Sequence, residues 1–559
     1  GLGMLAGDYL KTASDLGVPV VAVGLLYQQS YFHQSLDDTG WQRETYLYND
    51  PGSLPLRRAQ AKDGSWLHID TEFLCRRVRF RVWQVTVGRI TLYLLDSNDP
   101  RNQAGDRGIT SQLYGGNREL RLVQETALNI CGWRLLDTLC CRDYVWHLNE
   151  GHAAFATLER MRTYCERHKA SFDEALWATR AGNIFTTHTP VAAGFDRYPI
   201  EVLRRYIDEF SQQLGVPAER LLTLADEGSG PGTTGGLRTP TPGPSVAPRE
   251  RPRSMCGIQR TTAGPERPYP GLRPTVCRVQ TTQPVVAGSR PTRRPAQPPQ
   301  HPVQLIVAGK AHPADQWGKN ALQAWYRFAR RVDVKDRVVF LEDYDIELAQ
   351  HLVQGVDVWL NTPRRPWEAC GTSGMKVLVN GGLNLSSLDG WWAEAWHADV
   401  GWALGDGGVH GEEQDDDDAT ALYELLEQDI APCFYHRDDA DIPARWLERV
   451  RHSMAQLTAS FSCNRMLQEY IESYYLPAAQ LLANRTKEKG ALAAELFQWH
   501  SGLSQHWHEI HLGELQFDER DGHRQVGLNV QLGGLNPEHL TVELLADPTD
   551  AESAITLAL

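Results

Sequence analysis

Long apolar runs and paired cysteine motifs are both missing from this chain of 559 residues. No stretch approaches the ~20 consecutive apolar residues that a membrane-spanning helix requires, so we expect no membrane partner. The ten cysteines are scattered, with Cys140 and Cys141 adjacent and no Cys-x-x-Cys pair, which indicates neither a zinc site nor a disulfide framework. No signal peptide opens the chain, whose first residue is Gly1. We therefore expect a reducing, cytoplasmic location and no bound metal.

Positive charge is in short supply, because 56 lysines and arginines stand against 70 aspartates and glutamates, a formal net charge of -14. This balance argues against non-specific nucleic-acid binding as the main role. A hydrophobic fraction of 42% and a charged fraction of 23% are typical of a globular protein. The length is sufficient for three or four domains.

Lysine is absent from residues 227–301, and acidic residues are almost absent from them. This segment holds roughly half of the 31 prolines and about eleven arginines, and it has no hydrophobic period. Such a composition is typical of a disordered linker. A GC-rich message translated out of frame would give the same composition, and we favour this second interpretation. The encoding DNA around codons 225–302 would decide between the two.

Before that segment, residues 1–226 alternate between strand-like and helix-like stretches, and the chain begins inside a helix-like one. The sequence predicts a buried parallel strand over 18–26, two strands over 78–83 and 90–95, and a helix over 118–139. Two further strands, over 144–149 and 183–188, end in polar residues, the second at His188. Polar residues at the carboxyl ends of strands mark the sites of α/β folds, although a lone histidine is more often structural.

Regular patterning returns at residue 302. Predicted strands over 303–310, 338–341 and 356–360 alternate with predicted helices over 320–331 and 346–355. This alternation predicts a parallel, doubly wound sheet whose site lies at the carboxyl ends of its strands. We expect amphipathic helices over 434–490 and a helical and β-rich tail over 491–559.

The acidic run over 412–418 looks like a metal-binding cluster, but it precedes a predicted helix over 419–428. Acidic residues stabilise the N-terminus of a helix. We therefore interpret this run as a solvated capping segment.

The stretch with the most distinctive chemistry is Glu368-Ala-Cys-Gly-Thr-Ser-Gly-Met-Lys376. The small residues Gly371, Thr372 and Ser373 allow backbone N–H groups to approach an anion at the start of a helix. Lys376 follows about one turn later, which suits a phosphorylated cofactor with an aldehyde for the lysine to capture. A glycine-rich turn before an ordinary helix with a surface lysine explains the local pattern equally well.

This stretch resembles the pyridoxal-phosphate signature of the α-glucan (glycogen, starch and maltodextrin) phosphorylases. Other blocks resemble those of the family and follow its order: Tyr114-Gly-Gly-Asn-Arg-Glu-Leu-Arg, Leu148-Asn-Glu-Gly-His, Thr186-Thr-His-Thr-Pro, Val307-Ala-Gly-Lys-Ala-His-Pro, Leu341-Glu-Asp-Tyr and Leu388-Asp-Gly. The resemblance covers nearly everything outside 227–301 and is closest to the shorter bacterial branch.

The resemblance implies an α/β fold of GT-B type, in which two Rossmann-like domains face each other across a cleft, followed by the small β-rich tail. The first would be a glucan-binding and catalytic domain over 1–226, incomplete at its start, and the second a pyridoxal-phosphate domain over 302–490. The implied reaction is phosphorolysis of terminal α-1,4-glucosidic bonds to glucose 1-phosphate with retained configuration. The implied partners are α-1,4-glucan, inorganic phosphate and further copies of the chain in a homo-oligomer, while chain-length preference and allosteric control stay open.

The resemblance also implies a cofactor site. Lys376 would hold pyridoxal 5'-phosphate as a Schiff base, and the backbone at Gly371, Thr372 and Ser373 would receive its phosphate. Tyr344 would pack at the pyridoxal ring. The cofactor phosphate would exchange a proton with the substrate phosphate, which protonates the leaving glycosidic oxygen.

On the sugar side, the resemblance assigns Glu368 as an acceptor for a glucose hydroxyl. His188 would bind glucose and support the developing oxocarbenium centre through its backbone carbonyl. Gly1 and Leu2 match the end of a glycine loop whose N–H groups face the phosphate, and Asn117 lies in a substrate-gating loop.

Two blocks of the family are not found between the N-terminal half and the strand near residue 303. One supplies an asparagine for the sugar, and the other supplies an arginine and lysines that bind the phosphates. Asp345 also stands where many relatives carry arginine. Two alternatives therefore stay open: a catalytically impaired glucan-binding fragment, and a nucleotide-sugar glucan synthase on the same fold. A pyridoxal-dependent aminotransferase is least favoured, because we identify no carboxylate to pair with the pyridine nitrogen.

Overall fold

The computed structural model describes residues 2–113, 115–141, 144–188, 196–224, 233–234, 301–411, 414–520, 523–541, 543–546 and 555–558. The predicted segment 227–301 lies outside these residues, apart from 233–234 and 301. By internal contacts the chain divides into two compact units. The first unit is Gly1–Glu159 with Asn183–Pro477, and the second is Arg160–Gly182 with Ala478–Leu559.

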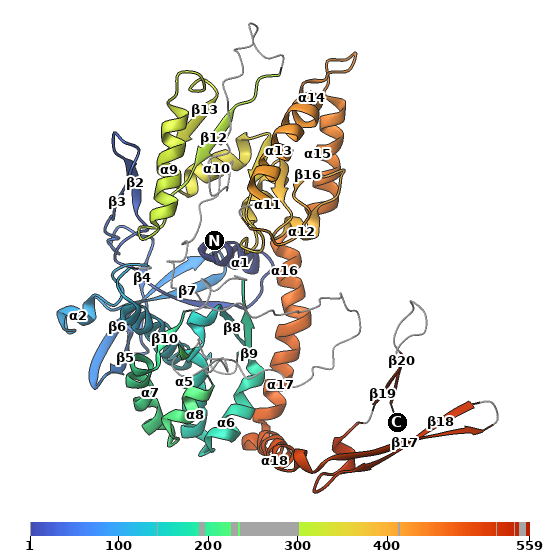
Figure 1. Cartoon of the computed structure of the whole chain (residues 1–559). Coiled ribbons are helices and arrows are strands. Elements are labelled where there is room, and N and C mark those ends of the chain that lie inside the picture. Colours follow the sequence, from blue (N-terminus) through green and yellow to red (C-terminus); the bar gives the residue numbers. More distant parts are fainter. Residues whose placement is uncertain are drawn as a thin grey trace. The chain divides into compact units, whose positions relative to one another are not determined.

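Up to residue 234 the structure mixes helices and strands, with the strands β1 to β7 following one another between α1 and α2 (Figure 1). In chain order the elements are α1 (Leu2–Asp15), β1 (Val21–Leu25), β2 (His33–Leu36), β3 (Gln42–Thr45), β4 (Arg57–Arg58), β5 (His68–Phe73), β6 (Arg76–Val87), β7 (Ile90–Asp96), α2 (Ala104–Arg107), α3 (Arg118–Thr126), α4 (Gly132–Thr138), β8 (Trp146–Asn149), α5 (Phe155–His168), α6 (Phe172–Thr179), β9 (Asn183–Thr186), β10 (Tyr198–Pro199), α7 (Ile200–Leu214), α8 (Ala218–Thr223) and β11 (Thr233–Thr234).

The N-terminal sheet is built on the predicted strands. β1, β7, β6 and β4 lie in that order, and β5 also pairs with β6. β1 runs parallel to β7, as predicted, although its residues are half-buried rather than buried. β6 and β7 form an antiparallel pair joined at Gly88, whose φ is +58°. A Cβ at Gly88 would lie 2.0 Å from the Ser14 Oγ, so the turn requires glycine.

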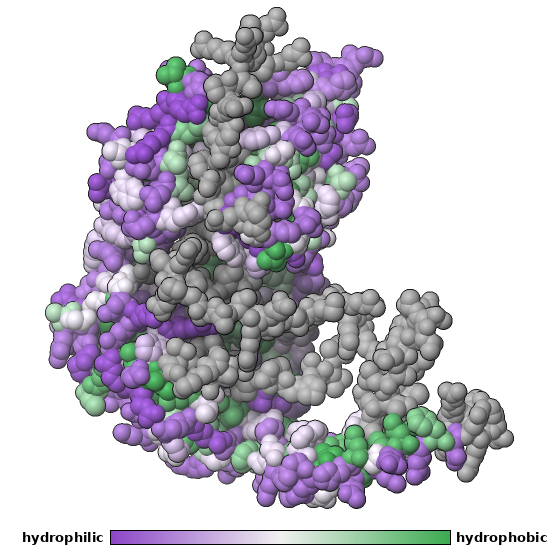
Figure 2. Space-filling view, in the orientation of Figure 1, coloured by the Kyte–Doolittle hydropathy of each residue, from purple (hydrophilic) through white to green (hydrophobic). Residues whose placement is uncertain are grey.

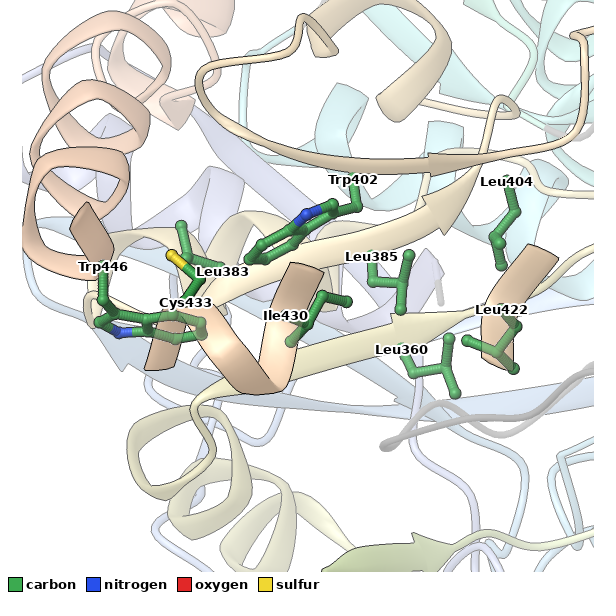
Figure 3. Packing of buried hydrophobic residues seen from close by; sticks show 9 residues of the cluster. All are labelled: Leu360, Leu383, Leu385, Trp402, Leu404, Leu422, Ile430, Cys433 and Trp446. Carbon is green, nitrogen blue, oxygen red and sulfur yellow. The ribbon is translucent and has the colours of Figure 1, made fainter. Parts of the chain in front are cut away.

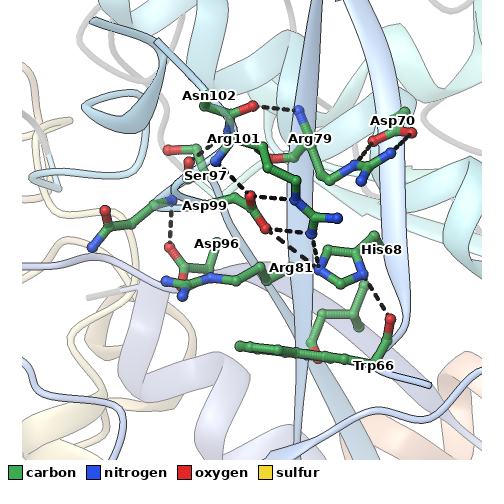
Figure 4. Close-up of polar contacts among 12 residues, drawn as sticks. Trp66, His68, Asp70, Arg79, Arg81, Asp96, Ser97, Asp99, Arg101 and Asn102 are labelled. Carbon is green, nitrogen blue, oxygen red and sulfur yellow. Dashed lines mark hydrogen bonds and ion pairs between the residues drawn. The ribbon is translucent and has the colours of Figure 1, made fainter. Parts of the chain in front are cut away.

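Buried carboxylates at the end of β7 are paired with arginines (Figure 4). Asp96 and Asp99 are 2% and 1% exposed. Asp96 accepts a hydrogen bond from Arg81 at 2.5 Å, and Asp99 pairs with Arg101 at 2.9 Å. Because a buried carboxylate is costly unless it is paired, these contacts fix the loop that follows β7.

Two other N-terminal predictions are confirmed. The helical stretch over 118–139 consists of α3, one π-helical turn (Ala127–Cys131) and α4. β8 and β9 are parallel neighbours, with Asn149 opposite Thr186, so their polar carboxyl ends lie side by side.

The rest of the chain is also a mixture of helices and strands. In chain order the elements are β12 (Leu305–Ala308), α9 (Gln316–Ala329), β13 (Val338–Leu341), α10 (Ile346–Gly355), β14 (Val358–Asn361), α11 (Thr372–Val379), β15 (Leu383–Ser387), α12 (Trp392–Ala395), β16 (Gly401–Leu404), α13 (Asp415–Leu425), α14 (Ala431–Tyr435), α15 (Ala444–Leu457), α16 (Cys463–Tyr470), α17 (Leu476–Thr486), α18 (Ala491–His506), β17 (His511–Arg520), β18 (His523–Gln531), β19 (Glu543–Ala546) and β20 (Ile555–Ala558).

The strands from β12 to β16 are all parallel, as predicted. β12 pairs with β13, and β14, β15 and β16 form a second group. The expectation of one continuous sheet is not met, since hydrogen bonds among the described strands leave these two groups separate. Side chains nevertheless join the groups, because Ala308 of β12, Trp359 of β14 and Val377 of α11 share one hydrophobic cluster.

The second parallel group carries the largest apolar cluster of this region (Figure 3). Strands β14 to β16 supply Leu360, Leu383, Leu385, Trp402 and Leu404, and the helical segments after them supply Leu422, Ile430, Cys433 and Trp446. Burial of one such leucine or isoleucine stabilises the fold by ~1.5–3 kcal/mol. This packing covers one face of the β14–β16 group, while α11 packs through Val377 and Leu378 into two other clusters.

Helix starts follow their capping residues. α10 covers the predicted residues, and the Asp345 side chain caps it by accepting a hydrogen bond from the N–H of Leu348 at 2.8 Å. α9 begins at Gln316, four residues before the predicted start, because Asp315 caps it through the N–H of Gly318 at 2.9 Å. The prediction of a start at residue 320 was therefore wrong.

The second unit ends in the expected β-rich tail. β17 pairs antiparallel with β18, and β19 pairs antiparallel with β20. Leu512, Leu515 and Phe517 of β17 are 67%, 47% and 68% exposed. Figure 2 shows the resulting apolar surface on this hairpin, in contrast to the polar surface around it.

Candidate functional site

Lys376 lies on α11, directly behind the predicted glycine-rich turn. The N-cap of α11 is Gly371, with φ +91°, and no side chain caps the helix. A Cβ at Gly371 would lie 3.1 Å from the Trp391 ring, and one at Gly374 would lie 2.5 Å from the Asn384 Oδ1. The two glycines therefore let the turn pack closely against Trp391 and Asn384, and the first N–H groups of α11, at Thr372 and Ser373, have no side-chain cap.

The segment after β15 holds this turn in place. Asp389, 6% exposed, accepts a hydrogen bond from the N–H of Glu368 at 2.9 Å. The N–H of Trp391 donates to the carbonyl of Cys370 at 2.8 Å. Burial raises the pKa of Asp389, while its two backbone hydrogen bonds oppose the rise. The Leu388-Asp-Gly block therefore has a positioning role that the sequence did not reveal.

The Lys376 Nζ donates a hydrogen bond to the Asp8 Oδ2 at 2.8 Å. Asp8 belongs to α1, 368 positions earlier in the chain, and sequence analysis did not single it out. Nothing in the local pattern distinguishes Asp8 from other acids on a half-exposed helix face.

Tyr344 packs against the cluster that contains Val377, the residue next to Lys376. Its neighbour Asp343 has φ +56° and binds the Lys310 Nζ at 2.6 Å. Asp343 also accepts a hydrogen bond from the N–H of Gln34 at 2.8 Å, which ties this loop to β2. Asp345, where many relatives carry arginine, serves here as the cap of α10.

A second polar group stands at the carboxyl ends of β8 and β9. The N–H of His188 donates to the Glu150 Oε1 at 2.8 Å, and the His188 Nε2 contacts the Asn149 Oδ1 at 2.9 Å. Burial lowers the pKa of His188, and the Glu150 carboxylate opposes this shift. Glu150 is itself 7% exposed and has φ +61°. Its part in holding His188 was not predicted.

α1 contacts Lys376 directly and strand β8 through Tyr475. Asp8 contacts Lys376, while the hydroxyl of the next residue, Tyr9, lies 2.8 Å from that of Tyr475. The Tyr475 hydroxyl in turn contacts the Nδ1 of His147 on β8 at 2.5 Å. His147 was not among the predicted site residues.

The remaining predicted residues are placed as follows. Leu2 is the first residue of α1, and Gly1 lies outside the described residues. Asn117 is exposed and caps α3 by accepting a hydrogen bond from the N–H of Leu120 at 2.9 Å. No contact joins Asn117 to Lys376, Glu368 or His188 among the residues that the structure describes.

Neither a metal cluster nor a membrane span emerges from the described residues. No group of three or more histidine, cysteine, aspartate or glutamate side chains there could hold a metal ion. In the acidic run, Asp415 to Asp418 form the first turn of α13, and Asp415 pairs with Arg364 at 2.5 Å. Within the same residues, every helix is too short or too polar to cross a membrane.

Together, the parallel strands and the helices between them define an α/β protein, with Lys376 about one turn behind a glycine-rich helix start. A model of the family described as carbohydrate phosphorylase matches residues 290–400. Glycogen phosphorylase of Mycobacterium tuberculosis (strain CDC 1551 / Oshkosh) is 35% identical to this chain over 100% of it and 79% of the relative. Maltodextrin phosphorylase of Thermococcus litoralis is 32% identical over 97% and 76%, and glycogen phosphorylase of Aquifex aeolicus is 30% identical over 85% and 83%.

The chain belongs to the carbohydrate phosphorylase family. The alignment with the mycobacterial protein runs over 688 positions against the 559 residues of this chain, so parts of that relative have no counterpart here. The match to the family model begins at residue 290, inside the segment 227–301.

Proposed function

We propose that this chain is an α-1,4-glucan phosphorylase, a glycosyltransferase that releases glucose 1-phosphate from the ends of glycogen or maltodextrin with retained configuration. The observation that carries the proposal is Lys376 at the start of an uncapped, glycine-lined helix, in a chain 30–35% identical to glycogen and maltodextrin phosphorylases. Two Rossmann-like domains of GT-B type would bring the two groups of site residues to one cleft. We also propose a homo-oligomer in the cytoplasm.

The residues present fit pyridoxal 5'-phosphate. Lys376 offers an amine for covalent attachment, and the N–H groups at Gly371, Thr372 and Ser373 offer an anion site without a competing side-chain cap. Tyr344 would pack at the ring, beside the cluster around Val377. When bound, the group supplies a phosphate that exchanges a proton with the substrate phosphate.

Buried polar atoms near the end of β14 support a ligand at this edge of the sheet. The Asn361 Oδ1 and the Thr362 Oγ1 lack a hydrogen-bond partner within the described part of the chain, although both residues are under 9% exposed. Such atoms are costly unless they are satisfied, so they fit a site that a polar ligand completes.

On the sugar side, Glu368 would accept a hydrogen bond from a glucose hydroxyl, and Asp389 holds its backbone. His188 would bind glucose, and the Glu150 and Asn149 contacts hold it at the end of β9. Since burial lowers the pKa of His188, its ring is neutral near pH 7 and presents no repelling charge to an oxocarbenium centre. Leu2 and Asn117 would contact the substrate from their helix starts, and Gly1 from the glycine loop.

The second candidate is a catalytically impaired glucan-binding protein. It is favoured by the absence of counterparts for parts of the mycobacterial relative, which agrees with the two phosphate- and sugar-binding blocks not found in the sequence. A nucleotide-sugar glucan synthase on the same fold would not need a covalent cofactor on Lys376.

The deciding experiment has two readouts on the full-length protein. Borohydride reduction after incubation with pyridoxal 5'-phosphate, followed by peptide mapping, should place the adduct on Lys376, and Lys376→Arg should abolish it. Glucose 1-phosphate release from maltoheptaose and phosphate should then follow the adduct. An adduct without turnover would favour the impaired protein, and no adduct on Lys376 would refute the phosphorylase mechanism.

A further inference from the structure

Asp8 is the acid that the structure brings to the nitrogen of Lys376. The two side chains are each 34% exposed, and the Asp8 Oδ2 lies 2.8 Å from the Lys376 Nζ. No other hydrogen bond or ion pair engages the Asp8 carboxylate within the described residues. Asp8 does not cap α1 and forms no ion pair within that helix. Its contact with Lys376 is therefore the structural role that we assign to it.

α1 presents Asp8 from a fixed position. Ala13 is fully buried in a cluster with Ile90 and Leu467. The Ser14 Oγ accepts a hydrogen bond from the N–H of Arg89 at 2.9 Å, and the Tyr9 hydroxyl contacts that of Tyr475. A side chain on such a helix holds its partner more accurately than one on a loop. The backbone of Asp8 is therefore fixed by the packing of α1, so its carboxylate can orient the Lys376 side chain.

Other titratable groups also lie near this lysine, on the segment before α11 and on α12 and α16. Cys463 of α16 lies near both Asp8 and Lys376, and Cys370 lies near Glu368, Glu394 and Lys376. Burial raises the pKa of Cys370 to about 11, and the two glutamates add to the rise. Both thiols are thus neutral near pH 7, and Glu368 and Glu394 make no hydrogen bond to Lys376 in the described structure. Asp8 is the charge in direct contact.

We propose that Asp8 is a positioning residue for the cofactor link, which holds the Lys376 amine in place for covalent attachment. This inference rests on the proposed function. In the attachment step the Nζ would form a bond to the aldehyde carbon, the C=O bond would break, and the oxygen would leave as water with two of the three ammonium protons. The remaining proton would stay on the nitrogen or pass to solvent. The Asp8 carboxylate would hold the amine before this step.

Loss of the carboxylate has a directional consequence. Replacement of Asp8 by an uncharged residue removes the acceptor that holds the Lys376 Nζ. It should therefore leave the free lysine less well oriented, which slows attachment.

The experiment measures how fast the adduct forms on Lys376 after pyridoxal 5'-phosphate is added, by borohydride trapping at timed intervals and peptide mapping. Asp8→Asn should slow adduct formation several-fold. Asp8→Glu, which keeps the carboxylate, should restore most of the rate. Asp15→Asn is the matched control, because Asp15 is an exposed acid on the same helix, and it should react like the unaltered protein. Asp8→Ala, which favours helix formation, makes the same prediction if Asp8→Asn does not fold.

An unchanged rate of adduct formation in Asp8→Asn or Asp8→Ala, with the adduct still on Lys376, would overturn the role of Asp8 and leave the proposed function intact. An equal slowing in the Asp15→Asn control would also overturn it, since any charge on α1 would then suffice. Absence of the adduct in the unaltered protein would instead count against the proposed function.

Discussion

His147 of β8 is a neutral, half-buried residue whose ring joins Tyr475 to Thr186 of β9. Its two ring nitrogens contact the Tyr475 hydroxyl at 2.5 Å and the Thr186 hydroxyl at 2.9 Å. Burial lowers the pKa of His147 to about 4, and the nearby His188 adds to the shift. Since an unfolded histidine titrates near pH ~6.5, the unfolded chain binds more protons between these values, and stability rises with pH there.

The free energy of unfolding should therefore fall by ~2–3 kcal/mol as the pH drops from 7 to 4, at ~1.4 kcal/mol per unit of pKa difference. Urea titrations at pH 7, 6 and 5 measure the slope. His147→Gln, which cannot titrate, should have a shallower slope. A slope unchanged by His147→Gln would show that other groups carry the acid sensitivity.

At the residue scale, substitution of the buried Asp99 should cost more stability than substitution of an exposed acid. It is 1% exposed, while the side chain of its partner Arg101 is 56% exposed. Asp99→Asn should lower the free energy of unfolding by ~2 kcal/mol, the value of a charge-assisted hydrogen bond, because Arg101 can regain water. Chemical denaturation measures the loss. The exposed Asp38→Asn is the control, expected within ~0.5 kcal/mol of the unaltered protein, and a loss of that size for Asp99→Asn would contradict the buried pair.

At the element scale, the spacing of apolar residues along the sequence predicted most helices and strands, but it did not predict the contacts between them. α10 was predicted to the residue, although its cap, Asp345, was not recognised from the sequence. α9 was predicted to start too late, since Asp315 was not read as a cap.

In the candidate site, too, local features could be predicted from the sequence and long-range contacts could not. The Lys376 turn could be read from consecutive residues, whereas its contact with Asp8 depends on how 368 intervening positions fold. The hydrogen bonds from the N–H of His188 to Glu150 and from the N–H of Glu368 to Asp389 likewise join segments that are distant in the sequence, and no local pattern predicts them. Predictions from a sequence reach the residues within one element and stop at the contacts between elements.

At Gly390 the segment after β15 approaches the segment of Glu368 and Cys370 closely, and a substitution there tests whether this approach is required. Gly390 has φ +54°, and a Cβ there would lie 2.5 Å from the carbonyl oxygen of Cys370 and 2.9 Å from the Glu368 Cγ. Gly390→Ala should cost ~2–4 kcal/mol of stability, from the left-handed backbone and from overpacking. It should also reduce turnover, because Glu368 is displaced.

Gly355→Ala is the matched control, since a Cβ at Gly355 meets nothing within 4 Å and its backbone suits alanine. It should be neutral or stabilising by up to ~1 kcal/mol in thermal or urea unfolding. Equal effects of the two substitutions would show that the approach of the Gly390 turn to Cys370 is not the constraint.

At the scale of the whole molecule, the two compact units should respond differently to the cofactor. Lys376, Tyr344 and the turn at Gly371 all lie in the first unit, while the second unit, Arg160–Gly182 with Ala478–Leu559, holds none of the proposed site residues. A ligand that binds the native state at 100 times its dissociation constant stabilises that state by ~2.7 kcal/mol. Pyridoxal 5'-phosphate should therefore raise the denaturant midpoint of one unfolding transition and leave the other unchanged.

Urea unfolding followed by tryptophan fluorescence and by far-ultraviolet circular dichroism measures both transitions, with and without the cofactor. Pyridoxal without its phosphate should give a smaller rise, because the helix start at Gly371 then receives no anion. Lys376→Arg should lose most of the rise, since it cannot form the covalent link. Equal shifts of both transitions, or a single transition that moves as a whole, would show instead that the two units unfold as one cooperative body.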